Sequence, residues 1–268
     1  MIRQNKGDMF AIGIVVATLV ICGFLLYSFT FSSKSIKTSM LSSAMIQELN
    51  DKETKFGFYV KDSAHLAEGQ AIFEIARKGA VSDFSCKPYE SEPQYVIWSS
   101  TCSPASDTGL FKKYFNSSFE KFVGNYHDAN FTNSKFSMDV ANAKAEIKFD
   151  PITLVNSDEK GILKYSVEYR FNLSFAHNFE ISPAEFNNIY DLSFAKLKKC
   201  KEKSNDMTVI TSCMGELNPE KWEMRIHSGA SAGRDYLLFD LTSKKKFFFE
   251  DDRFKWERVI LRFGIAVQ

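Results

Sequence analysis

The feature that most constrains the fold of this chain is an uncharged run of 23 residues, Met9 to Phe31, near the N-terminus. As a helix the run is about 34 Å long, against about 30 Å for the hydrocarbon core of a bilayer. A surface helix of a soluble protein has a polar face, whereas this run offers only one serine and two threonines. The run predicts a transmembrane helix over residues 9–31, behind a cytoplasmic tail of residues 1–8. A cleaved signal peptide is the weaker alternative, because its apolar region is only about 7–15 residues long and ends at a small-x-small site.

The basic residues beside this run do not orient it, because Arg3 and Lys6 precede it and Lys34 and Lys37 follow it. The short tail and three N-x-S/T sequons downstream favour an extracellular C-terminal part. These features predict a single-pass protein of the cell membrane, with glycosylation at the sequon asparagines, which are Asn116, Asn130 and Asn172.

The cysteines support the same compartment. Cys22 lies inside the apolar run, and the other four form two local couples, Cys86 with Cys102 and Cys200 with Cys213. No Cys-x-x-Cys is present, so a zinc ribbon or a redox motif is not indicated. Closing loops of this size gains about 3 kcal/mol, and we therefore expect two disulfides, which persist in an oxidising environment. The alternative is four reduced thiols in a cytosolic domain.

The charge of the outer part excludes a nucleic-acid footprint. Leaving out Arg3, Lys6 and Asp8, 32 basic residues balance 32 acidic ones, whereas nucleic-acid binders usually carry a basic patch. The Lys244–Lys246 run lies beside three phenylalanines, but acidic residues flank it on both sides, which is typical of a solvated hairpin tip.

Helical periodicity covers the first half of the outer part. Apolar residues recur at helical spacing over 32–50, which predicts a helical stalk that continues the membrane helix. Residues 51–130 then form a mainly helical region with a disulfide, including a helix over 63–78 that stops at Gly79. A short strand over 94–99 and a helix beginning at Ser103-Pro104 follow.

From about Phe131 the period changes to two, which is typical of an antiparallel sheet with one buried face. Between 163 and 175 every odd position is apolar and every even one is polar. We expect residues 131–268 to form a mostly antiparallel sheet of seven to nine strands, with the strand 162–176 central and paired to 143–149. The final strand, 257–267, should also pair inside the sheet.

One helix, Pro183–Lys199, should pack on the apolar face of this sheet behind a capping box made by Ser182 and Glu185. Further strands are expected over 207–212, 222–227, 236–241 and 246–249. The fold class is therefore α+β, and the 26 phenylalanines are core material because they fall on the apolar faces.

Two short patterns in the sequence resemble parts of functional sites. His65-x-x-Glu68 places two potential metal ligands one helical turn apart, but a zinc site needs a third ligand. The other histidines, His127, His177 and His227, are isolated in the sequence, so we predict no metal site.

The second pattern, Gly229-Ala-Ser231-Ala-Gly233, matches the G-x-S-x-G of a nucleophile elbow. That motif needs a helix after the serine and a later histidine. A strand pattern follows instead, and no histidine lies beyond His227, so a small loop between two strands is the better interpretation. We expect no catalytic residue and no cofactor.

The N-terminal Lys6-Gly7-Asp8, followed at once by a long apolar helix, resembles the archaeal class III signal peptides of type IV pilin-like proteins. The resemblance covers about 25 residues, and Asp8 departs from the Gln or Ala more usual there. It implies cleavage between Gly7 and Asp8 and packing of the helix against copies of itself in a filament.

These observations favour a membrane-anchored extracellular surface protein with a structural, adhesive or partner-binding role. One alternative is the pilin-like filament subunit, and another is an exported hydrolase of surface polymers that uses Ser231. The expected partners are the membrane, further copies of the chain through the N-terminal helix, and a protein or surface partner, but no nucleic acid.

Overall fold

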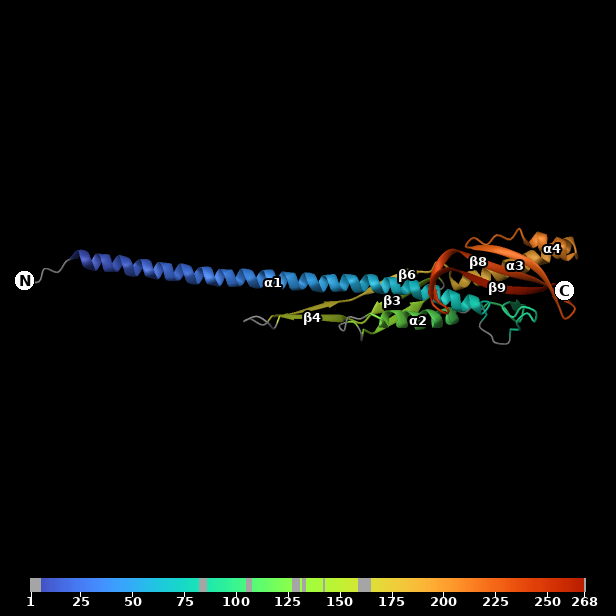
Figure 1. Cartoon of the computed structure of the whole chain (residues 1–268), viewed down its shortest axis with the longest axis horizontal. Helices are drawn as coiled ribbons and strands as arrows, with labels where there is room; N and C mark the ends of the chain where they lie inside the picture. The colour runs from blue at the N-terminus through green and yellow to red at the C-terminus, as the bar shows by residue number, and fades with distance from the viewer. Residues whose placement is uncertain are drawn as a thin grey trace, which may run out of the picture. The chain divides into compact units, whose positions relative to one another are not determined.

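The computed structural model describes residues 6–81, 86–104, 108–126, 131, 134–141, 143–158 and 165–267. They belong to two compact units. The first unit joins the chain up to Thr54 with Thr153–Arg170, and the second holds Lys55–Ile152 and Phe171–Gln268. Helix α1, Lys6–Arg77, contributes residues to both units and is the blue to cyan helix of Figure 1.

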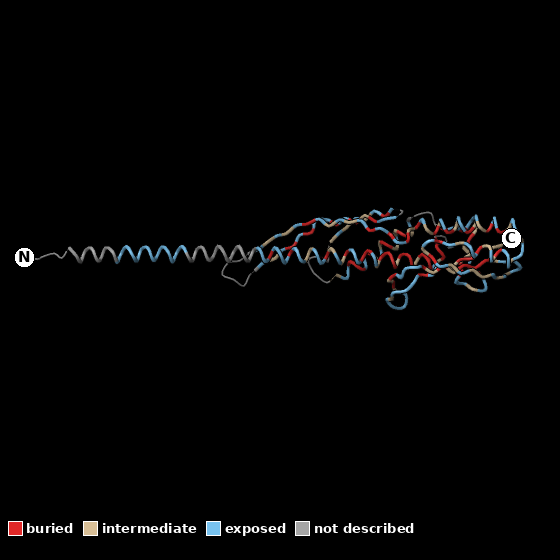
Figure 2. Tube along the Cα trace, turned by 90° about the horizontal axis from the view of Figure 1, so that it is seen from above, coloured by how far each residue is buried: buried red, intermediate tan, exposed pale blue. Residues whose placement is uncertain are grey.

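The predicted transmembrane helix over 9–31 is wrong. In the part of the chain that the structure describes, no helix combines the length and the apolarity that a bilayer crossing needs. The described side chains of this region are all exposed from Val15 to Ser28, in pale blue in Figure 2.

The separate stalk and second helix are also corrected, because α1 runs without a break through residues 51–62. That stretch contains no proline, and Phe56 and Val60 are fully buried within it. Burial of these two side chains favours one continuous helix over the two separate helices that the sequence suggested. The helix ends at Arg77, and Gly79 follows with a φ of +66°, a conformation that glycine adopts without strain.

In the first unit a hairpin accompanies α1. Strands β4 (Ile152–Asp158) and β5 (Tyr165–Phe171) form a two-stranded sheet. The Asn156 side-chain amide donates to the Glu48 carboxylate at 2.9 Å, and the Tyr169 hydroxyl donates to Glu53. These bonds attach both strands to the helix.

The second unit contains a four-stranded sheet in the order β1-β9-β8-β7. Strands β7 (Trp222–Ser231), β8 (Arg234–Glu250) and β9 (Phe254–Val267) are antiparallel, and β1 (Val96–Trp98) pairs parallel to β9. The final strand therefore lies inside the sheet, as predicted. Lys244–Lys246 are exposed, but they lie within β8 at a register shift rather than at a hairpin tip.

A separate three-stranded antiparallel sheet has the order β2-β3-β6, with β2 Phe136–Val140, β3 Lys144–Phe149 and β6 Ser174–Asn178. The expectation of one large sheet is therefore wrong, although the α+β class with mostly antiparallel strands is confirmed. Residues 162–176 do not form one central strand, because β5 pairs with β4 and β6 pairs with β3. The alternation itself is right: odd positions from 167 to 179 are less exposed than the even ones.

The described residues also form three shorter helices, α2 (Thr108–Gly124), α3 (Pro183–Lys203) and α4 (Met207–Met214). Residues 207–212 were expected to be a strand, but the Asp206 carboxylate accepts from the Thr208 amide at 2.7 Å and starts a helix. The Ser182 side chain makes no capping hydrogen bond, so the predicted capping box is absent. The Glu185 carboxylate lies 3.7 Å from Lys221 instead.

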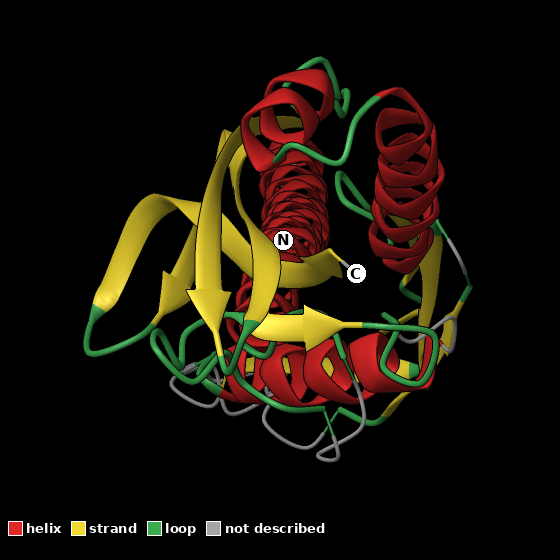
Figure 3. Cartoon of the chain, turned by 90° about the vertical axis from the view of Figure 1, so that its right-hand side faces the viewer, coloured by secondary structure: helices red, strands yellow, loops and turns green. Residues whose placement is uncertain are grey.

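Stacked aromatic rings lie between the strands of the four-stranded sheet and between this sheet and α1; all strands are yellow in Figure 3. The Trp98 ring stacks on Phe263 with centroids 3.5 Å apart, and Phe263 stacks on Phe239 at 4.6 Å. The Phe73 ring of α1 stacks on Phe249 of β8 at 4.2 Å. The buried phenylalanines are thus core material, as expected.

We predict that Phe263→Ala lowers the free energy of unfolding by about 3–5 kcal/mol, because it leaves a cavity between two stacked rings. Ile260→Thr on the same strand is the matched control: Ile260 is 39% exposed, and surface changes cost within about 0.5 kcal/mol. Urea unfolding of both variants measures the difference. Equal free energies of unfolding for the two variants would contradict the conclusion that this aromatic stack stabilises the core.

Candidate functional site

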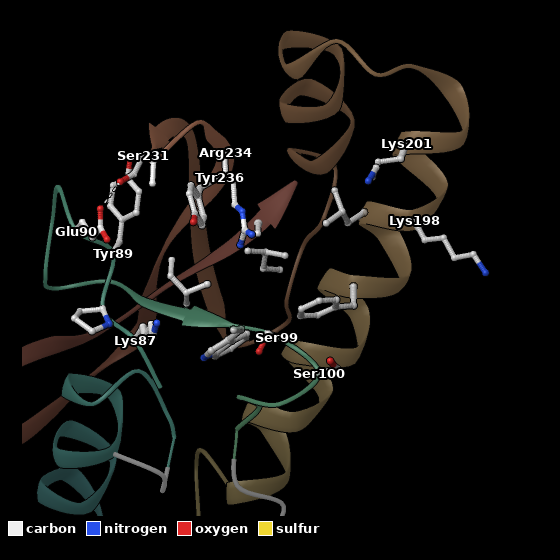
Figure 4. A pocket seen from close by; sticks show the side chains of 18 of the residues that line it. Lys87, Tyr89, Glu90, Ser99, Ser100, Lys198, Lys201, Ser231, Arg234 and Tyr236 are labelled. Carbon is white, nitrogen blue, oxygen red and sulfur yellow. Dashed lines mark hydrogen bonds between the residues drawn. The ribbon is translucent and has the colours of Figure 1, made fainter. Parts of the chain in front are cut away.

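A pocket of about 850 Å³ lies in the second unit, at one end of the four-stranded sheet. Its walls come from the segment 87–100, from α3, from the turn between β7 and β8, and from the end of β9. Figure 4 shows these elements around the space. The volume is in the range of about 300–1,000 Å³ that is typical of small-molecule sites.

Apolar side chains line the floor of this pocket. Ile97 and Trp98 come from β1, Phe194 and Leu197 from α3, and Ile265 from β9. Trp98 is 1% exposed, and its indole N–H donates to the Gly79 carbonyl at 2.8 Å. The floor is therefore held rigidly by the core stack described above.

Basic side chains outnumber acidic ones at the pocket rim. Figure 4 shows Lys201 and Arg234 directed toward the space from opposite walls. The charged lining residues are Lys87, Lys198, Lys201 and Arg234 against Glu90 and Glu202. Among the described residues, no carboxylate forms an ion pair with any of the four cations. Lys198 points away from the space in Figure 4, so the cations that a ligand in the pocket meets are chiefly Lys201 and Arg234.

Ser231 also lines the pocket, at the turn between β7 and β8. Gly229 to Ser231 are the end of β7, and Ala232 and Gly233, with φ angles of 47° and 73°, form the two-residue loop of the hairpin. The sequence had indicated a small loop between two strands here. The Ser231 hydroxyl donates to the Glu90 carboxylate at 3.1 Å. No histidine is among the described residues that line the pocket, and His227 contacts Tyr95 elsewhere in the sheet.

Both predicted disulfides, Cys86–Cys102 and Cys200–Cys213, are confirmed. The first brackets the segment 87–100 that forms one wall. The second ties α3, which forms the opposite wall, to α4. The covalent bonds therefore brace the pocket on two sides.

A second group of polar side chains, His65, Glu68 and His177, lies outside the pocket. Their potential ligand atoms all lie within 4.8 Å of one another. The first two are neighbours in the sequence, whereas His177 comes from β6, far along the chain, and was not predicted to join them. The odd-position alternation over 163–175 continues to 177 and would have placed this histidine on the buried face.

Glu68 is the buried centre of this group, with 1% exposure. One of its oxygens accepts from the backbone amides of Glu180 at 2.5 Å and Ile181 at 3.4 Å, and the other lies 2.9 Å from Nε2 of His177. Beside it, the hydrogen bond from Lys245 at 2.6 Å lowers the pKa of the Glu180 carboxyl below its usual value.

The sequons lie in different surroundings. Asn172 is exposed between β5 and β6, whereas Asn116 lies on α2 with its side-chain oxygen buried. Asn130 and His127 fall outside the described residues. Glycosylation stays a prediction, and the accessible Asn172 amide is the position that favours it.

No protein-family model, curated protein or solved structure matches this chain. The pocket, the group around Glu68 and the two disulfides are therefore the features of this chain that bear on its function.

We predict that peptide mapping without reductant recovers two linked pairs, Cys86 with Cys102 and Cys200 with Cys213. Cys22, an exposed free thiol, is the internal control and should alkylate under the same conditions. Reduction should cost about 3 kcal/mol of stability for each loop of this size. Finding all five cysteines alkylated without reductant would contradict both the pairing and the oxidising compartment.

Proposed function

We propose that this chain is an extracellular binding protein whose disulfide-braced pocket holds an organic anion with an apolar body. The observation that carries the proposal is the pocket itself, in which an apolar floor lies below Lys201 and Arg234, two cations that no described carboxylate pairs with. A ligand that satisfies both features needs apolar surface to displace water from the floor and an anionic group to meet the rim.

The chemistry of the rim supports an anion over a neutral ligand. Arg234 can bind a carboxylate, sulfate or phosphate oxygen in a bidentate manner, and Lys201 adds a charge from the other wall. The apolar floor gains about 25 cal/mol for each Å² removed from water. Among the structural, adhesive and partner-binding roles expected from the sequence, binding of an organic anion in this pocket corresponds to the last.

The two disulfides support a location outside the cytoplasm, because such bonds are rare where thiols are kept reduced. Binding also fits the site better than hydrolysis of surface polymers. Ser231 has a carboxylate beside it, but the described pocket residues offer no histidine to act as its base.

We predict that anilinonaphthalene sulfonate, an aromatic sulfonate, binds the folded protein with an increase in fluorescence. Lys201→Glu and Arg234→Glu should each weaken binding about tenfold or more, because a charge-assisted hydrogen bond contributes about 1.5–3 kcal/mol. Fluorescence titration of each variant measures the dissociation constant.

Lys246→Glu makes the same charge change at an exposed position outside the pocket lining and should bind as the wild type does. Unchanged affinity in both rim variants, or an equal loss in the control, would overturn the proposed site. Covalent labelling of Ser231 by a serine-reactive phosphonate would instead support the hydrolase alternative.

A second candidate function is the pilin-like filament subunit. The specific observation in its favour is that every residue from Val15 to Ser28 is exposed, including Phe24 at 74% and Leu19 at 68%. An apolar surface on all sides of a helix is stabilised in water when other helices cover it. Copies of the same helix would do so in a filament core.

We predict on this alternative that the mature chain starts at Asp8, as mass spectrometry of the protein from its native cells would detect. Leu19→Glu should then prevent assembly into filaments, because it places a charge among packed apolar side chains. Lys52→Glu, on a later turn of α1, is the control and should assemble normally. An intact Met1 in the mature protein would rule this alternative out.

A further inference from the structure

We infer that His65, Glu68 and His177 form a binding site for a divalent transition-metal ion of the zinc class. Two imidazole nitrogens and one carboxylate oxygen make up a common protein ligand set for such ions, with a fourth position left to water. Nothing in the proposed function of the pocket requires this site, so the two proposals stand separately.

The geometry of the three side chains suits a small cation. Metal–ligand distances of about 2.0–2.2 Å in a tetrahedral site put the donor atoms about 3.3 Å apart. The Glu68 oxygen and His177 Nε2 are already 2.9 Å apart, and the whole group lies within 4.8 Å. No two of these donor atoms are therefore more than about 1.5 Å beyond that tetrahedral spacing, and the exposed His65 can adjust its rotamer.

The protein holds the buried ligands in place before any metal arrives. Backbone amides of Glu180 and Ile181 fix one oxygen of Glu68 and leave the other directed at His177. The His177 ring packs against Phe179, with centroids 5.6 Å apart. Support of this kind orients metal ligands and limits their motion.

The electrostatics also favour a cation. A glutamate with 1% exposure carries a charge that is costly to bury without a positive partner. Nε2 of His177, 2.9 Å from one Glu68 oxygen, meets this need in part, and a purely structural contact between the two side chains would require nothing more. A purely structural contact between Glu68 and His177 does not explain why His65 lies beside them.

His65 is exposed, and its ring contacts that of His177 edge-on with centroids 4.6 Å apart. In the described part of the chain its side chain makes no hydrogen bond or close ion pair, although Glu180 lies near enough to interact with it electrostatically. An uncommitted imidazole beside a buried carboxylate and a second imidazole completes a three-ligand set, and its exposure gives an ion a path from solvent.

A bound ion would link α1 to β6, and therefore join the long helix to the three-stranded sheet. Zinc should then raise the thermal stability of the chain, because a ligand that binds only the folded state stabilises it. The test uses the full-length protein with Zn²⁺ alone, followed by isothermal titration and by thermal unfolding. Co²⁺ serves as a spectroscopic probe, since its visible absorption reports four-coordinate geometry.

The wild type should bind one Zn²⁺ per chain and unfold at a higher temperature with it. His65→Gln should raise the zinc dissociation constant by at least about tenfold, since even changes to groups that only orient a ligand cost about 10–100-fold. The exposed position of His65 keeps this variant folded. Glu68→Gln retains an acceptor for the two backbone amides and should lose zinc binding as well.

His227→Gln is the matched control, because His227 lies in the same unit but outside the cluster. It should bind zinc and gain stability as the wild type does. No zinc binding by the wild type, unchanged affinity in His65→Gln, or an equal loss in His227→Gln would each overturn the proposal.

Discussion

Three consecutive residues of α1, Glu68 to Gln70, hold much of the second unit together. Glu68 accepts from the backbone just after β6. Gly69 lies so close to β8 that a Cβ there would collide with the Phe248 carbonyl. The Gln70 side chain exchanges two hydrogen bonds with the backbone of Glu250, at 3.1 and 2.7 Å. One stretch of helix thus anchors strands from two separate sheets.

The sequence was most informative where neighbouring residues decide the structure. The cysteine couples, the alternation after 163 and the end of α1 near Gly79 all follow from local spacing, and the structure agrees with each. The alternation of apolar and polar residues also continues to position 177, and this would have placed His177 on the buried face. The candidate metal site was missed at this point, since its third ligand lies 109 residues from Glu68.

The pairing of strands and the ends of the helices and strands were harder to infer from the sequence, because they depend on contacts between distant residues. An unbroken apolar alternation suggested one central strand, yet Asn172 is an exposed position at which the chain passes from β5 to β6. Likewise, nothing local distinguishes a strand from a helix over 207–212, where the Asp206 cap decides the outcome. The pocket was not predictable at all, since its floor and rim come from four separate segments.

The sequence-local disulfides have a consequence for the order of oxidative folding. Four cysteines allow three pairings, and both non-native pairings would close loops on the order of a hundred residues. The native loops span only 16 and 13 residues. Each doubling of loop length costs about 0.6 kcal/mol in closure entropy, so the native pairs are favoured while the chain is still unfolded. Both covalent braces of the pocket can therefore form before the sheet assembles, without help from the tertiary structure.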